Sequence, residues 1–310
     1  MPGMDIRVHT VLSDKGFFSM LDTLLSALRA SERDGIPLYA DWSGATNYLN
    51  EPGNLFDRFF EQPFGIRAED LENHRVVETV RHASPYWNRD YRFEWWYRLD
   101  KKRIGESSRL LKKYVTVKAE YAGRADAFFR ERLSPRTLGV HLRGGDMTNV
   151  FSMGHVRTPP VSSYVKAASR ELGRGGYSHL FCSSDDQRLL DVFLRRMGET
   201  GALPLTVVTS SMQRSASGES LHLKPGAWTD KCRLAEDVLV EMLLLSRCAF
   251  LVKTPSNVSN FAVFFNPTLP FFDVTTLPVE RMRRAANALA LWSGFALRTP
   301  AKLVRRLRRG

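Results

Sequence analysis

The chain has 310 residues, of which 43 % are hydrophobic and 25 % charged, and this composition excludes a disordered or collagen-like protein. The length exceeds what one hydrophobic core usually supports, so two domains are expected. Three cysteines without a CxxC pair indicate neither a disulfide framework nor a zinc site.

The net charge of +12 is unevenly distributed along the chain. Residues 281–310 hold nine basic side chains and no acidic one, so the other 280 residues carry only +3. The body of the protein is therefore close to neutral, and the basicity belongs to the C-terminal tail. Residues 1–11 lack the apolar run of a secretory signal, which favours a cytoplasmic protein.

The first segments predict a strand–helix–strand unit. Residues 6–11 and 36–39 have the composition of short strands, and a stripe of apolar residues over 17–31 predicts an amphipathic helix between them. This order is typical of a parallel sheet. A further amphipathic helix is expected over 54–64.

Aromatic and arginine side chains alternate over residues 86–98. Such a segment suits stacking on a sugar or a base, although core packing or a subunit contact explains the same rings. One helix is expected over 110–133, and Ser134-Pro135 then begins the second domain.

The segment 138–146, near the midpoint, predicts a buried strand that ends in a glycine-rich turn. His141 and Arg143 lie two residues apart, so their side chains share one face of an extended strand, and Asp146 follows the turn. Open α/β sheets bind ligands at the carboxyl ends of their strands, and a binding site is expected here. The competing interpretation is a core histidine beside a structural ion pair.

Polar residues also follow the next predicted strand, 179–183. Asp185 and Asp186 stand at its carboxyl end, and one of them is expected to cap the helix predicted over 187–197. The other carboxylate then faces the expected ligand crevice. A short strand over 205–208 comes next.

The last motif joins a helix over 230–247 to a strand over 249–253 and the turn Thr254-Pro255-Ser256-Asn257. An apolar helix follows over 261–265. Hydroxyls and free amides in such a turn make a cradle for phosphate, although many αβα units end a strand in the same way.

Three motifs in this order resemble those of the fucosyltransferase superfamily. They are GVHLRGGD, HLFCSSDD and AEDVLVEMLLLSRCAFLVKTPSNVSNFAVFF. The nodulation fucosyltransferase and the α1,6-fucosyltransferases are the nearest members, and the α1,2- and protein O-fucosyltransferases are more distant. The likeness covers residues 13–65 and 136–267, and leaves the segment 86–133 and the tail unmatched.

The resemblance implies a GT-B-like α/β fold, in which two Rossmann-type domains face a cleft and a basic helical tail follows. We expect an acceptor-side domain over 1–133, a GDP-sugar-binding domain over 134–280 and the tail over 281–310. It also implies site residues. Their expected contacts are guanine and ribose for His141, the β-phosphate for Arg143, the guanine edge for Asp185 or Asp186, and the pyrophosphate for Ser256 and Asn257.

The implied reaction is an inverting transfer of fucose from GDP-fucose to a hydroxyl of a glycan acceptor. Arg143 would stabilise the charge that develops on the leaving diphosphate. The chain has no D-x-D triplet, which agrees with a mechanism that needs no metal and no other cofactor. The acceptor hydroxyl also needs a base.

The sequence departs from the α1,6 enzymes around this base. Met147 and Phe151 stand where those enzymes have a lysine and a glutamate, and Gly144 stands where they have a second arginine. Asp146 is the first candidate for the base, although it could serve only to brace Arg143. Two other candidates are Asp14 and His155.

The tail has two competing interpretations. An uncharged run over 285–297, flanked by arginines, is too short to span a bilayer and suits a helix lying in an anionic membrane surface. This predicts a peripheral protein on the inner face of the membrane, acting on a surface glycan or a lipid-linked oligosaccharide. The alternative is a helix packed back on the N-terminal domain.

Two other classes of function compete with the transferase. The departures at Met147 and Phe151 suit a GDP-sugar-binding protein with impaired catalysis. The net charge suits a nucleic-acid-binding protein, but no recognition motif accompanies it, so nucleic acid is not the expected partner.

Overall fold

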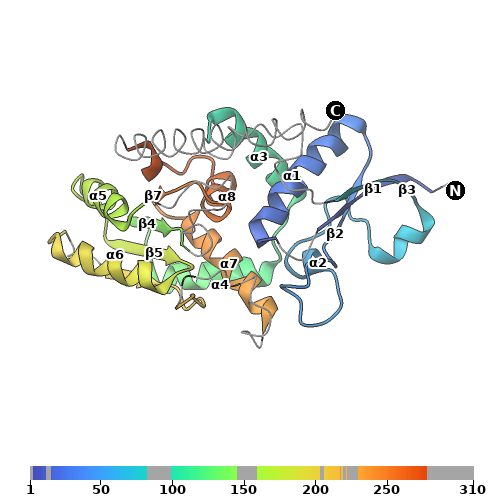
Figure 1. Ribbon diagram of the computed structural model, residues 1–310. Coiled ribbons are helices and arrows are strands. Elements are labelled where there is room, and N and C mark those ends of the chain that lie inside the picture. Colours follow the sequence, from blue (N-terminus) through green and yellow to red (C-terminus); the bar gives the residue numbers. More distant parts are fainter. Residues whose placement is uncertain are drawn as a thin grey trace, which may run out of the picture.

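A computed structural model shows two parallel sheets with helices packed between and around them (Figure 1). The structure describes residues 3–11, 15–81, 99–144, 159–202, 206–216, 218, 221 and 230–277. The smaller sheet comes from the first 81 residues and the larger one from residues after 136.

The smaller sheet has the order β2-β1-β3, and both of its pairings are parallel. The connection from β1 to β2 runs through α1, as the strand–helix–strand pattern predicted. Helix α1 buries the predicted apolar stripe and ends at Gly35, whose φ of 67° is a left-handed conformation that favours glycine. The elements are β1 (Asp5–Thr10), α1 (Phe17–Asp34), β2 (Leu38–Asp41), α2 (Leu55–Phe59), the 3-10 helix η1 (Ala68–Asn73) and β3 (Arg75–Arg81).

Two predictions for this half were wrong in detail. The helix expected over 110–133 is two helices, α3 (Lys101–Tyr114) and α4 (Ala119–Arg132), and the helix expected over 54–64 is the five-residue α2. Both differences have one cause. Val117 pairs with Phe60 in an isolated antiparallel bridge, which holds the β-branched stretch 115–117 extended and ends α2.

The larger sheet has the order β6-β5-β4-β7-β8, with every pairing parallel. The chain proceeds from β4 to one side and then returns to place β7 on the other, so the switch point lies between β4 and β7. The elements are β4 (Thr137–Leu142), α5 (Val161–Leu172), β5 (His179–Ser184), α6 (Gln187–Glu199), β6 (Thr206–Thr209), α7 (Lys231–Leu245), β7 (Phe250–Lys253), α8 (Asn257–Phe265), β8 (Phe271–Asp273) and the 3-10 helix η5 (Val274–Thr276).

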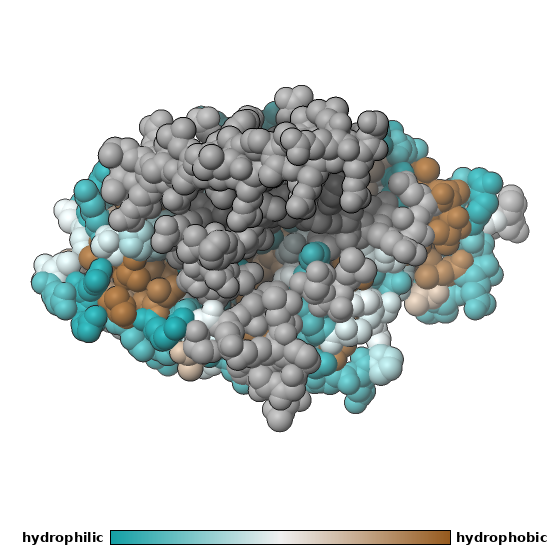
Figure 2. Space-filling view, in the orientation of Figure 1, coloured by the Kyte–Doolittle hydropathy of each residue, from teal (hydrophilic) through white to brown (hydrophobic). Residues whose placement is uncertain are grey.

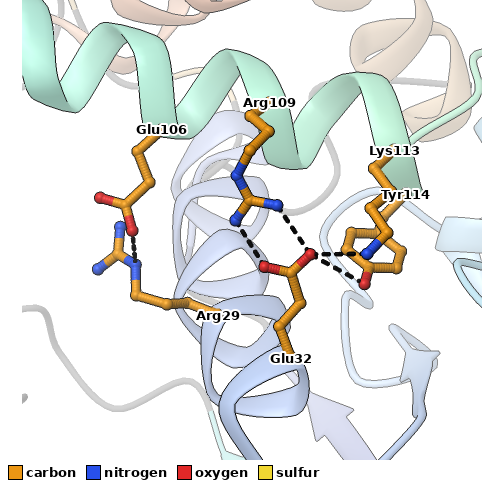
Figure 3. A network of polar contacts seen from close by, with 6 residues as sticks. All are labelled: Arg29, Glu32, Glu106, Arg109, Lys113 and Tyr114. Atoms are coloured by element: carbon orange, nitrogen blue, oxygen red, sulfur yellow. Dashed lines mark hydrogen bonds and ion pairs between the residues drawn. The ribbon is translucent and has the colours of Figure 1, made fainter. Parts of the chain in front are cut away.

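Helices from both halves share one hydrophobic core between the sheets (Figure 1). The ring of Phe18 in α1 lies 5.1 Å from that of Phe261 in α8. Charged groups add a second contact, because Glu32 of α1 bonds Arg109, Lys113 and Tyr114 of α3 (Figure 3). The packing of α1 and α3 against α8 therefore joins the smaller sheet to the larger one.

Among the described residues few large apolar side chains are exposed, and Figure 2 shows apolar colour at the outer end of the smaller sheet. Met4, Val76 and Val77 are exposed there. Among the described residues, none of the helices has the length and apolar character needed to cross a membrane.

Candidate functional site

A row of buried polar side chains crosses the carboxyl end of the larger sheet. Ser183 of β5 lies opposite His141 of β4 in the parallel register, and Val140 lies opposite Val252, which places Lys253 beside His141. All three polar residues are almost fully buried. The preceding rows of these strands are apolar, so polar side chains gather at the carboxyl end of the sheet beside the switch point, where open α/β sheets commonly bind ligands.

His141 is a neutral imidazole at this edge. Burial, together with the positive charges of Arg143 and Lys253, lowers its pKa from 6.5 to about 3. Its Nδ1 atom is buried and accepts no hydrogen bond from any residue that the structure describes. Since an unpaired buried polar atom is costly, the ring has capacity to bind a ligand.

Arg143 lies just after β4 and is held by Asp185. Its Nη1 atom is 2.6 Å from Asp185 Oδ2, while the Gly144 amide donates to Asp185 Oδ1 at 2.9 Å. The side chains of Arg143 and Asp185 are 23 % and 25 % exposed, so the pair is fixed in place and still open to solvent. A guanidinium held this way is suited to bind a phosphate or a carboxylate.

Asp186 takes the structural role that one of the two aspartates was expected to have. It caps α6 by accepting from the Arg188 amide, and its carboxylate also pairs with the Arg188 side chain at 2.9 Å. Asp186 is fully buried. Of the two carboxylates, Asp185 is therefore the one that is partly open to solvent.

Gly144, where the resemblance to the α1,6 enzymes leads one to expect a second arginine, is closely packed. A Cβ atom at this position would lie 2.5 Å from the Cβ of Asp186 and 2.8 Å from Leu189 Cδ1. No side chain fits there without moving the turn that follows β5. The β4 turn thus packs closely against the β5–α6 turn, which keeps Arg143 next to Asp185.

The turn after β7 presents hydroxyls and the start of α8. Ser256 is the N-cap residue of α8, but its side chain makes no capping hydrogen bond. Ser259 instead donates to the carbonyl oxygens of Thr254 and Ser256, at 2.8 and 3.2 Å. Asn257, the first residue of α8, is only partly buried. The arrangement leaves the first helical amides to an anion.

Two buried charged residues at this edge were not singled out from the sequence. Lys253 ends β7, and Glu241 of α7 accepts from Ser210 Oγ at 2.6 Å. Burial raises the pKa of Glu241 from 4.5 to about 7, although the Ser183 and Ser210 hydroxyls and Arg214 oppose the shift. A lysine as the last residue of an apolar strand was the available signal for Lys253. The sequence places Glu241 outside the apolar stripe of the helix over 230–247, which indicates an exposed side chain, but the structure buries it.

Several predicted residues lie outside the described part of the chain. They are Asp146 and the other candidate bases Asp14 and His155, the departures Met147 and Phe151, the aromatic segment 86–98 and the tail 281–310. Within the described residues, no group of three or more His, Cys, Asp or Glu side chains could hold a metal ion. The described site thus supplies cations, amides and a neutral imidazole, and such groups suit an anionic ligand.

A separate hollow of about 320 Å³ lies between residues 49–54 and the start of α7. Its walls include Arg58, Asp230 and Cys232. It shares no lining residue with the β4 and β7 edge, and the candidate site described above does not depend on it.

Comparison with known proteins gives a consistent fold. No protein-family model and no curated protein sequence matches the chain. NodZ α-1,6-fucosyltransferase co-crystallized with GDP has a TM-score of 0.53 at 18 % identity, and the alignment covers 87 % of this chain and 94 % of that one. NodZ soaked with GDP-fucose has a TM-score of 0.51 at 20 % identity, and the alignment again covers 87 % of this chain and 94 % of that one.

A second fucosyltransferase has the same arrangement of elements. POFUT1 in complex with GDP has a TM-score of 0.51 at 11 % identity, covering 88 % of this chain and 99 % of that one. The similarity therefore spans both sheets and nearly the whole length of each neighbour. With its two parallel sheets and its site at the switch point of the larger one, the chain has the GT-B-like α/β fold of the fucosyltransferases.

Proposed function

We propose that the protein is a glycosyltransferase that moves fucose, or a closely related sugar, from a GDP-sugar to a hydroxyl of a glycan. The observation that carries the proposal is Arg143, fixed by Asp185 and open to solvent at the switch point of a fucosyltransferase fold. The neighbours' bound GDP and GDP-fucose support the choice of donor.

The described residues divide the donor between them in this proposal. Asp185 accepts from the guanine edge, neutral His141 bonds the ribose or the base, and Arg143 binds the β-phosphate. Ser256, Asn257 and the first amides of α8 bind the pyrophosphate. These assignments place the nucleoside over β4 and β5 and the diphosphate over β4 and β7.

The reaction is an inverting displacement without a metal. The acceptor oxygen attacks the anomeric carbon, the bond from that carbon to the phosphate oxygen breaks, and the acceptor proton passes to a base. The β-phosphate gains negative charge as the bond breaks, and the Arg143 guanidinium stabilises this charge. Asp146 is the proposed base, and residues 1–133 form the proposed acceptor side.

The test measures thermal stabilisation of the wild-type protein by GDP, GDP-fucose, GDP-mannose and a UDP-sugar. We expect stabilisation by the GDP ligands and none by the UDP-sugar, and no effect of any GDP ligand would refute the proposal. GDP release with glycan acceptors then tests catalysis. Asp146→Asn should bind GDP-fucose and lose transfer if Asp146 is the base.

A binding protein with impaired catalysis is the second candidate. The close packing around Gly144 favours it, since the edge has no room for the second arginine of the α1,6 enzymes. GDP binding without hydrolysis or transfer, over a panel of glycan acceptors, would identify this function.

We also propose that residues 281–310 attach the protein to an anionic membrane surface. Basic residues near such a surface contribute about 1 kcal/mol each. Flotation with liposomes that contain anionic lipid should recover the full chain and not a chain that ends at residue 280. Equal recovery of the two would contradict the attachment.

A further inference from the structure

Lys253 is a buried cation whose place the function above does not explain. It is the last residue of β7, it is 1 % exposed, and its ammonium lies over the Phe271 ring at 5.4 Å. Its hydrogen bonds go to neutral groups, namely Asn260 Oδ1 at 2.8 Å and the Thr254 carbonyl at 3.4 Å. A buried charge is costly unless something compensates it.

The nearest acid does not pair directly with this ammonium. Asp273 of β8 acts on Lys253 only through its charge, and Asp273 Oδ1 is engaged by the amide and hydroxyl of Thr275. On the other side, Arg103 of α3 adds a second positive charge. Arg103 itself is paired with Asp22 of α1 at 3.5 Å. Two cations and two acids therefore lie behind the β7–α8 turn, and Lys253 is the cation that bonds the turn itself.

The hydrogen bonds of Lys253 have a consequence for the turn itself. Thr254 O accepts from Lys253 Nζ and from Ser259 Oγ, and Ser256 O accepts from Ser259 Oγ and from the Asn260 amide. Both carbonyl oxygens are thus bonded to groups inside the protein. Carbonyl oxygens repel an anion and amides attract it, so this orientation favours anion binding at the start of α8.

We infer that Lys253 is a positioning residue for the donor diphosphate. Its ammonium holds the Thr254 carbonyl and Asn260 so that the first amides of α8 face the diphosphate, and its charge lies directly behind them. The inference rests on the proposed function and adds a second cation to the site, beside Arg143 and the amides at the helix start.

The electrostatic surroundings keep the Lys253 ammonium charged at neutral pH and let it lose its proton at a slightly higher pH. Burial lowers the pKa of Lys253 from 10.5 to about 8; Asp273 opposes this shift and Arg103 adds to it. His141 of β4 also faces this region, but its pKa of about 3 keeps it neutral throughout. Binding of a polyanion should hold the proton on Lys253, so affinity for the diphosphate should fall as the pH rises through 8.

The test is calorimetric titration of Lys253→Met with GDP and with guanosine. Methionine keeps the length and burial of the side chain and removes its charge. We expect GDP to bind about ten- to a hundredfold more weakly and guanosine to bind as before, because only GDP carries the diphosphate. Lys166→Met is the matched control, since Lys166 is an exposed cation of α5 in the same half of the chain, and should leave both affinities unchanged.

A second measurement needs no variant. The ratio of GDP to guanosine affinity of the wild type should fall several-fold between pH 7 and pH 9, and Lys253→Met should abolish this dependence. The inference would be overturned if Lys253→Met lost affinity for GDP and guanosine equally, or if the wild-type affinity ratio stayed constant with pH. Either result would leave the proposed function standing. Failure of the wild type to bind GDP would overturn the proposed function, and the inference with it.

Discussion

The two sheets end in the same kind of histidine, and the two rings are used differently. His9 is the second-last residue of β1 and His141 is the second-last residue of β4, and both are buried. In the smaller sheet, His9 Nε2 contacts Thr23 Oγ1 at 3.1 Å and its Nδ1 accepts from Trp42 Nε1 at 3.2 Å. In the larger sheet, His141 Nδ1 has no partner among the described residues.

The arginines beside these histidines show the same contrast. Arg7 pairs with Asp34 at 2.7 Å, and its side chain is 4 % exposed. Arg143 pairs with Asp185 at 2.6 Å, but its side chain is 23 % exposed. The smaller sheet thus uses its polar residues to hold α1 and β2 in place. The larger sheet keeps part of its hydrogen-bonding capacity, which distinguishes a binding edge from a structural one.

The largest expected effect follows from removing Arg143, the partly exposed arginine. Arg143→Ala should lower the transfer rate by about 10²–10³, because the charge on the departing diphosphate loses its principal donor. Stabilisation by GDP should fall as well. Arg136→Ala is the matched control, since Arg136 is an exposed arginine at the amino end of the same strand. Equal rates for the two variants would contradict the role of Arg143.

The next effect concerns the buried acid behind the larger sheet. Glu241 has a pKa of about 7 in the folded chain and 4.5 as its ordinary value, so the folded state holds the extra proton between these limits. The free energy of unfolding should therefore decline as the pH rises from 4.5 to 7, by a few kcal/mol at most.

Urea unfolding over this pH range measures the decline. Glu241→Gln should remove this part of the pH dependence, because glutamine keeps the hydrogen bond with Ser210 and does not titrate. Identical pH profiles for the variant and the wild type would show that Glu241 does not titrate in this window.

Replacing each of the two histidines by alanine should have smaller effects, which differ in kind between the two variants. His9→Ala should lower the free energy of unfolding by about 1–3 kcal/mol, because Trp42 and Thr23 lose a buried partner, and should leave GDP affinity unchanged. His141→Ala should lower the affinity for GDP and for guanosine about tenfold and leave the free energy of unfolding nearly unchanged. Thermal melting measures the stability of each variant and calorimetry its affinity for GDP. Loss of GDP affinity in His9→Ala and loss of stability alone in His141→Ala would contradict the contrast between the two sheets.

The smallest effect is expected at the α1–α3 contact. Glu32 accepts from Arg109, Lys113 and Tyr114, and the hydrogen bond from Arg109 is the main cause that lowers its pKa from 4.5 to about 2 (Figure 3). Its contribution is present above pH 4.5 and is lost as the pH falls toward 2. Because Arg109 and Lys113 are more than half exposed, Glu32→Gln should cost about 1 kcal/mol or less.

High salt provides the control for this contact. It should reduce the difference between Glu32→Gln and the wild type, because exposed charges are screened. A large loss of stability that salt does not change would contradict a surface contact.

The sequence was informative where local pattern and place on the sheet coincide. Period and composition predicted the strand–helix–strand start and the strand before His141, and the motif order predicted the GT-B-like fold. The preference of aspartate for N-cap positions predicted that Asp185 or Asp186 would cap the start of α6, and Asp186 is the residue that does so.

Long-range pairing was beyond the local pattern. The break between α3 and α4 depends on a bridge from Val117 to Phe60, and the hydrogen-bond partner of the buried Glu241 is Ser210, which follows a distant strand. Lys253 lies beside His141 only because β4 pairs with β7. Each of these contacts joins residues far apart in the chain, where periodicity carries no information.

Hydrogen–deuterium exchange with and without GDP tests the central claim most directly. GDP should protect the amides after β4, β5 and β7, which lie in segments 143–144, 185–188 and 254–259, and should leave segments 9–11 and 41–45 of the smaller sheet unchanged. Protection at the end of the smaller sheet, with none after β4 and β7, would contradict a donor site at the switch point of the larger sheet.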